Sequence, residues 1–136
     1  MAAIIVAGIA GPGWPGSRWG LSVAGAAVAL AGGIVATLAA RTLGSGLTPF
    51  PRPSMRGAIA ERGPYRVVRH PMYSGGLLFF LGFSLSFSPA AFGLTIALAV
   101  VWALKARVEE RFLGVANPTY DDYRERTRFR LVPYVY

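Results

Sequence analysis

Two polar clusters in this chain combine residue types that can bind a charged ligand. The first, residues 63–75, holds the chain's only histidine together with arginines and two tyrosines. The second, residues 105–111, holds two adjacent glutamates among basic residues. An uncharged run from Pro71 to Leu104 lies between them. Ionisable groups at the edge of such a run are costly and usually mark a functional site. We therefore interpret the two clusters as halves of one binding site.

The first cluster leads into a predicted helix start that suits an anion. Proline restricts the residue before it and favours the first helical position, so a helix is predicted to begin at Pro71. The free backbone N–H groups of its first turn, close to Arg69 and His70, then favour a carboxylate. Tyr65 and Tyr73 add aromatic faces that attract a cation.

The second cluster supplies acceptors of the opposite charge. Glu109 and Glu110 can accept hydrogen bonds from an ammonium group or from ribose hydroxyls. A ligand with a carboxylate, an ammonium, a sulfonium and a ribose would use both clusters, and S-adenosylmethionine is that ligand.

Each piece of the site also has a plainer interpretation. The arginines alone would serve as membrane-surface anchors. His70 alone would be a structural hydrogen-bonding residue, and the glutamates alone could pair with basic neighbours at helical spacing. Their joint position at both ends of one apolar run favours a binding site.

The elements that must position these clusters are predicted to be membrane helices. The chain has 136 residues, 54% hydrophobic and 15% charged, which indicates a single domain over residues 1–136. Uncharged runs cover Gly20 to Ala40 and Pro71 to Leu104, and a spanning helix needs about 20 apolar residues. The second run is too long for one span, and Pro89 near its middle predicts a break. The expected fold class is all-α, an integral membrane helical bundle with a C-terminal helical hairpin and a cytoplasmic cofactor-binding face.

Three further segments flank these helices. The apolar stretch Met1 to Ala10 ends at glycines and prolines that stop a helix, and it lacks the positive start of a cleaved signal peptide. It is either a short span or a partly inserted segment. The connection from Thr42 to His70, rich in proline and glycine, is predicted to be extended and to carry half of the site. Residues 117–126 predict a short amphipathic helix, and the aromatic end, residues 129–136, is expected to dock back.

Charge placement predicts the orientation of the chain. Of the 14 Lys and Arg residues, only Arg18 precedes the first long apolar run, and the others fall within residues 41–69 and 105–130. The positive-inside rule places those two regions in the cytoplasm. The net charge of +8 fits this topology together with attraction to anionic lipid, and nothing resembles a nucleic-acid module.

Small residues recur every four positions in the first long run, at Gly25, Ala29, Gly33 and Thr37. Such spacing lets helix backbones approach closely in lipid. Packing within the bundle is the favoured interpretation, and the seam of a homodimer is the alternative.

The residue content excludes several chemistries. The chain has no cysteine and one histidine, so it lacks a ligand set for zinc or an iron–sulfur cluster, and thiol catalysis is excluded. Ser74 near His70 is predicted to cap a helix rather than to act as a nucleophile. No glycine-rich phosphate loop is present.

The string from Gly63 to Tyr73, followed by a hairpin and by Glu109-Glu110, closely resembles the isoprenylcysteine carboxyl methyltransferase family and the related phospholipid methyltransferases. The resemblance covers roughly Leu47 to Tyr136. It implies an integral membrane enzyme that takes S-adenosylmethionine from the cytoplasm and a lipophilic acceptor from the bilayer. It also implies a set of cofactor-binding residues: Tyr65, His70, Pro71, Met72, Tyr73, Glu109 and Glu110.

The resemblance also implies an arginine before the glutamates that contacts the acceptor carboxylate. Arg107 is the nearest match, Lys105 is the alternative, and Arg69 is the second candidate catalytic arginine. The chain is shorter at its N-terminus than eukaryotic members, as expected of a prokaryotic protein of the plasma membrane.

The sequence favours a carboxylate as the methyl acceptor. A carboxylate is already nucleophilic, whereas a phospholipid amine must first lose a proton and the chain offers no convincing base. Methylation of a phospholipid or amine nitrogen is the alternative. An alternative of another class is a small non-enzymatic transporter or assembly subunit, against which the uncharged helix interiors argue.

Overall fold

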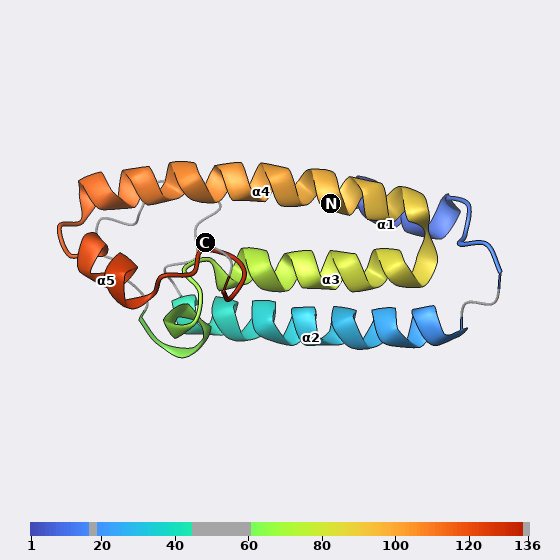
Figure 1. The fold of residues 1–136 in the computed structure, drawn as a ribbon, viewed down its shortest axis with the longest axis horizontal. Coiled ribbons are helices and arrows are strands. Elements are labelled where there is room, and N and C mark those ends of the chain that lie inside the picture. Colours follow the sequence, from blue (N-terminus) through green and yellow to red (C-terminus); the bar gives the residue numbers. More distant parts are fainter. Residues whose placement is uncertain (17–18, 45–60, 135–136) are drawn as a thin grey trace. The chain divides into compact units, whose positions relative to one another are not determined.

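The computed structural model describes residues 1–16, 19–44 and 61–134, and most of these residues are helical (Figure 1). The elements in chain order are α1 (Ala2–Ala10), α2 (Trp19–Leu43), the 3-10 helix η2 (Gly63–Arg66), α3 (Pro71–Phe87), α4 (Pro89–Ala116) and α5 (Tyr120–Arg126). Within the described residues no strand occurs beyond one isolated bridge between Val68 and Phe129. The predicted all-α fold class is confirmed.

The chain divides into two compact units. The first contains Met1–Ile34 and Gly75–Val101, and the second contains Val35–Ser74 and Trp102–Tyr136. Helices α2, α3 and α4 each contribute residues to both units. The units are described in turn.

Two of the helices, α2 and α4, are long and apolar enough to cross a membrane, and α3 is a shorter apolar helix. Many apolar side chains of α2 and α4 are not covered by the rest of the chain. Leu30 on α2 is 68% exposed, and Val100 and Val101 on α4 are both 57% exposed. Helices that leave this much apolar surface uncovered are suited to contact with lipid.

In the first unit, α3 and α4 form the predicted hairpin, which breaks at Ser88-Pro89. Pro89 takes the first helical position of α4, where its missing N–H costs nothing. The Ser88 hydroxyl accepts a hydrogen bond from the Ala90 N–H at 3.2 Å and so caps the new helix. The two arms pack together at Thr95 on α4, which is buried and whose hydroxyl lies 3.4 Å from the Phe80 carbonyl on α3.

Small residues bring α2 and α3 into close contact within the first unit. A Cβ on Gly82 of α3 would lie 2.2 Å from the Ala29 nitrogen and 2.3 Å from the Gly25 oxygen on α2. Only glycine therefore allows these two backbones to approach as they do. Packing of the small-residue stripe inside the chain is confirmed at Gly25 and Ala29.

The sequence predicted that the stripe of small residues continues through Gly33. In the structure it continues through Gly32 instead. A Cβ on Gly32 would lie 2.3 Å from the Phe79 nitrogen, whereas a Cβ on Gly33 would meet only the Phe79 ring at 3.8 Å. Each step of four residues turns about 40° past a full turn of an α-helix. Gly32, seven residues after Gly25, therefore stays on the contact face better than Gly33, which is eight residues after it.

The N-terminal helix α1 ends before Gly11, as predicted, and packs on α3 in the first unit. Gly8 lies against the Phe83 ring, which a Cβ would approach to 2.3 Å. After the helix, the Trp14 indole donates a hydrogen bond to the Ser84 carbonyl at 3.1 Å. These contacts attach the N-terminal segment to the hairpin.

In the second unit, part of the connection before α3 is helical and not extended. Gly63 has a φ of +55°, which favours glycine, and Pro64 follows at the start of η2. This corrects the expectation of an extended connection for residues 63–66. Residues 45–60 of the predicted connection lie outside the described residues.

The C-terminal segment docks on the residues before α3. Helix α5 carries acidic residues in its first turn and basic residues in its last, which complements its dipole, and it buries Tyr120 and Tyr123. The Arg69 N–H then donates to the Phe129 carbonyl at 2.9 Å, and the His70 N–H donates to the Arg130 carbonyl at 3.0 Å. Docking of the tail is thus confirmed at residues 129–130, whereas Val132 and Tyr134 are 52% and 91% exposed. Residues 135–136 lie outside the described part.

Candidate functional site

The two polar clusters lie in contact within the second unit. The start of α3 presents Tyr73, whose hydroxyl donates a hydrogen bond to Glu109 Oε1 at 2.7 Å. The residue two positions before that helix, Arg69, donates from Nε to Glu110 Oε1 at 2.8 Å. The glutamates follow one another on α4, so the fold joins clusters that are separated by the whole apolar hairpin.

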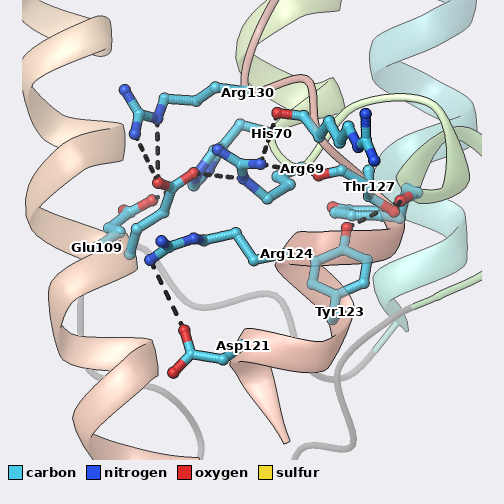
Figure 2. A network of polar contacts seen from close by, with 11 residues as sticks. Arg69, His70, Glu109, Asp121, Tyr123, Arg124, Thr127 and Arg130 are labelled. Carbon is cyan, nitrogen blue, oxygen red and sulfur yellow. Dashed lines mark hydrogen bonds and ion pairs between the residues drawn. The ribbon is translucent and has the colours of Figure 1, made fainter. Parts of the chain in front are cut away.

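Glu110 is the buried centre of this network, with a 7% exposed side chain. Its Oε1 accepts from Arg69 and lies 3.2 Å from His70 Nε2, while its Oε2 lies 3.0 Å from Arg130 Nε and 2.9 Å from Arg130 Nη2. Figure 2 shows Arg69 and Arg130 approaching α4 from two different segments. A buried carboxylate needs such partners, because burial without them would be strongly unfavourable.

Arg69 is itself buried, with 5% of its surface exposed. In addition to Glu110, it donates from Nη1 to the Thr127 carbonyl at 2.8 Å and to the Arg128 carbonyl at 2.7 Å (Figure 2). The guanidinium thus ties α4 to the C-terminal segment. Its position suits the support of Glu110 better than contact with an acceptor.

His70 stands immediately before α3 and bridges the two glutamates. Its Nε2 is in hydrogen-bond range of Glu110, and its Nδ1 lies 3.7 Å from Glu109 Oε2. The imidazole stacks parallel to the Tyr73 ring, with centroids 5.5 Å apart and planes 6° apart. The stack holds the imidazole in place between the carboxylates.

An aromatic row continues from His70 through Tyr73 to Trp102. The rings of Tyr73 and Trp102 have centroids 5.3 Å apart. Our sequence interpretation missed Trp102, although a signal was present. Trp102, Lys105 and Glu109 are spaced at i, i+3 and i+7, which places them on one face of α4.

Glu109 is the more accessible of the two glutamates. Its side chain is 19% exposed, and its side-chain partners within the described residues are Tyr73, the Nδ1 side of His70 and Lys105, whose Nζ lies 3.8 Å from Oε1. Adjacent positions on a helix are turned about 100° apart, which explains why one carboxylate is enclosed and the other is not.

The remaining predicted site residues take different positions. Pro71 is fully buried at the start of α3, and Met72 is half-buried beside it. Tyr65 is buried, and burial raises its pKa to about 12. Its carbonyl accepts a hydrogen bond from the Tyr123 hydroxyl at 2.8 Å. Arg107 is exposed, and its side chain makes no hydrogen bond or ion pair with the part of the chain that the structure describes.

Arg130 was not predicted as a site residue. The sequence indicated only that the tail would dock through apolar side chains, and a single arginine in a basic chain carries no local signal. The backbone hydrogen bonds between the tail and residues 69–70 bring its guanidinium to Glu110. Its role depends on the tertiary fold.

This arrangement is suited to a ligand that carries a positive charge and an aromatic or sugar group. A partly exposed carboxylate stands beside the flat faces of an aromatic row, and a rigid ion network supports both. An ammonium group would find a charged acceptor there, and aromatic faces attract a cation. These acceptors fit the ammonium and ribose groups of S-adenosylmethionine. Across residues 1–16, 19–44 and 61–134, no group of three or more His, Cys, Asp or Glu side chains is placed to hold a metal ion.

Comparison with known proteins gives a family match across most of the chain. A family model described as phospholipid methyltransferase matches residues 21–116. The matched residues include the polar cluster before α3, the whole hairpin and both glutamates. They begin before Leu47, where the resemblance seen in the sequence starts, and they end before the tail that carries Arg130.

A curated relative matches part of the chain. The chain is 37% identical over 71 residues to the cobalt-zinc-cadmium resistance protein CzcN of Cupriavidus metallidurans. The aligned region covers 51% of this chain and 33% of CzcN, so the chain spans about a third of the length of this relative.

Proposed function

Because the chain belongs to the phospholipid methyltransferase family, we propose that it is a membrane methyltransferase that uses S-adenosylmethionine. One observation carries the cofactor assignment. The Glu109 carboxylate is held by the Tyr73 hydroxyl at 2.7 Å, remains 19% exposed, and lies beside aromatic faces. This is the surrounding that an amino-acid ammonium group requires.

The residues of the second unit would divide the binding of the cofactor. Glu109 would accept hydrogen bonds from the ammonium or the ribose, and Tyr73 and His70 would provide the aromatic surface. Tyr65, Pro71 and Met72 would shape the site around the start of α3. Glu110 would either contact the cofactor directly or hold His70 in position. Arg69 and Arg130 would hold the Glu110 carboxylate in place.

The proposed reaction is a direct displacement at a methyl carbon. When bound, the cofactor supplies a methyl group on a positively charged sulfur, which needs no further activation by the protein. The chain's contribution is to hold donor and acceptor in line and to exclude water. Positioning of this kind can lower a barrier by roughly 7–11 kcal/mol.

We propose a lipophilic carboxylate as the acceptor. His70 Nε2 is engaged with Glu110, and the glutamates are engaged with cationic or hydroxyl partners. None of these groups stands ready to remove a proton from an amine. Arg107 is exposed on the same helix as the glutamates and would bind the acceptor carboxylate. A phospholipid amine is the second candidate acceptor, and the description of the matched family favours it.

The enzyme would lie in a prokaryotic plasma membrane with its site facing the cytoplasm. The basic residues that flank the apolar runs support this orientation. A lipophilic acceptor would then reach the site from the bilayer, while the cofactor would come from the cytoplasm.

Calorimetric titration of the detergent-purified protein with S-adenosylmethionine and S-adenosylhomocysteine tests the proposal. We expect saturable binding of both compounds. An absence of binding would favour the competing proposal, a non-enzymatic transporter or assembly subunit. Methyl transfer from labelled cofactor to a farnesylated cysteine analogue and to phosphatidylethanolamine then separates the two acceptors: transfer to the carboxylate alone supports our assignment, and transfer to the amine alone overturns it.

A further inference from the structure

A lysine forms an ion pair with Glu109, the more accessible of the two glutamates in the site. Lys105 stands one helical turn before Glu109, and its Nζ lies 3.8 Å from Glu109 Oε1. The same Nζ lies 5.5 Å from the centroid of the Tyr73 ring. The lysine side chain is 42% exposed, so other positions in solvent are open to it.

The position of this ammonium group matches the position that a ligand ammonium would require. A carboxylate and an aromatic face together form a cation site. The lysine head is a primary ammonium, which is the same chemical group that an α-amino acid carries. Glu109 accepts one further hydrogen bond from Tyr73, while Glu110 is enclosed by Arg69, His70 and Arg130. Glu109 is therefore the acceptor that a ligand would contend for.

We propose that Lys105 occupies the site of the cofactor's α-ammonium in the ligand-free protein and must move away when the cofactor binds. This inference rests on the proposed function and deepens it. The exposed lysine pairs weakly with Glu109, as pairs at this helical spacing do. Its displacement therefore lowers the affinity for the cofactor without preventing binding. In the ligand-free protein, the lysine also provides a counter-charge for the partly buried Glu109 carboxylate.

The test is calorimetric titration of wild-type protein and of Lys105→Met, which keeps an unbranched side chain one atom shorter and removes its charge. Three compounds serve as probes: S-adenosylmethionine, S-adenosylhomocysteine and 5′-methylthioadenosine. The first two carry an α-ammonium and the third has none. We expect Lys105→Met to bind the first two about three- to tenfold more tightly, by the same factor for each, with unchanged affinity for 5′-methylthioadenosine.

Arg111→Met provides a matched control, because it removes one positive charge from the same helix at an exposed side chain to which no role in the site is assigned. It should leave the affinity for all three compounds within about twofold. An equal gain in this control would assign the effect to net charge and overturn the inference. Lys105→Gln should repeat the gain, and thermal unfolding of each ligand-free variant shows whether the fold is kept.

The two proposals fail in different ways. If wild-type protein binds S-adenosylmethionine and Lys105→Met binds it equally or more weakly, Lys105 is not a competitor for the site and this inference alone is overturned. If neither protein binds any of the three compounds, the cofactor assignment fails and the inference falls with it. Binding by Lys105→Met alone would support both.

Discussion

Arg69 and Glu110 form a buried ion pair in which Nε and Oε1 lie 2.8 Å apart and both side chains are less than a tenth exposed. Arg69 precedes the apolar hairpin and Glu110 follows it. The pair therefore joins the segment before α3 to α4 within the second unit. Because Arg130 joins from the C-terminal segment, one carboxylate holds three parts of the chain together.

Glu110→Gln should destabilise the fold strongly. The substitution removes the negative partner of two arginines and leaves buried Arg69 without its counter-charge, a change that typically costs about 3–5 kcal/mol. Urea unfolding in detergent, followed by circular dichroism, would measure the loss. Glu125→Gln, at an exposed position of α5, is the control and should change stability by less than about 0.5 kcal/mol. A loss at Glu110 no larger than in the control would contradict the assigned role.

Glu109→Gln should instead weaken the cofactor and spare the fold. Its carboxylate is partly exposed, and the amide can still accept from the Tyr73 hydroxyl. Loss of a charged hydrogen bond to an ammonium corresponds to roughly 1.5–3 kcal/mol, or about ten- to a hundredfold in affinity. Titration with S-adenosylmethionine measures this change, and thermal unfolding of the ligand-free protein monitors the fold. Wild-type affinity in this variant would remove Glu109 from the proposed site.

Gly82→Ala should disrupt the contact between α2 and α3. A methyl group at this position would lie within 2.3 Å of backbone atoms of Ala29 and Gly25, and backbone cannot turn aside. Such overpacking costs roughly 1–3 kcal/mol. Gly93→Ala in α4 is the matched control, because a Cβ there meets nothing within 4 Å. The control should be neutral or more stable by up to about 1 kcal/mol, since alanine favours the helix. Similar stabilities of the two variants would argue against the close packing.

Tyr123→Phe should lower stability by about 1 kcal/mol, the usual contribution of one hydrogen bond. The Tyr123 hydroxyl donates to the Tyr65 carbonyl at 2.8 Å, and burial raises the pKa of Tyr123 to about 12. The raised pKa means that the protonated phenol is favoured in the folded state. Its contribution is complete below the unfolded pKa of about 10 and is lost as the pH rises through the folded value.

The difference between wild type and Tyr123→Phe should therefore stay constant between about pH 6 and 9. Unfolding in denaturant at several pH values checks this expectation. A difference that changes with pH across this range would show that another titrating group controls the contact.

The orientation of the hairpin can be tested by cysteine labelling, because the chain has no native cysteine. Ala90→Cys lies at an exposed position after the hairpin turn, and Glu125→Cys lies in α5. From the distribution of basic residues, a membrane-impermeant maleimide should label Ala90→Cys in intact cells. It should label Glu125→Cys only after the cells are opened. The reverse pattern would overturn the predicted topology.

The sequence by itself determined the helices and the residue types of the site. Uncharged runs of membrane length, a proline at 89 and the dipeptide His70-Pro71 predicted where the long helices begin and break. These signals are local, because they depend on the missing N–H of proline and on apolar composition. The paired glutamates and the tyrosine-histidine cluster indicated that the two ends of the hairpin would meet, and they do so at Tyr73 and Glu109.

Only the tertiary structure decided how the charges are shared. The sequence left open which of Glu109 and Glu110 would face the site, and it offered Arg69 as a catalytic residue. In the structure Glu110 and Arg69 form a buried ion pair, while the Glu109 side chain remains partly exposed. Which of two adjacent carboxylates is enclosed depends on a rotation of about 100° and on what packs there. Arg130 packs against Glu110, because the tail forms backbone hydrogen bonds with residues 69–70 that bring the Arg130 guanidinium there. Contacts between such distant segments leave no periodic pattern in the sequence.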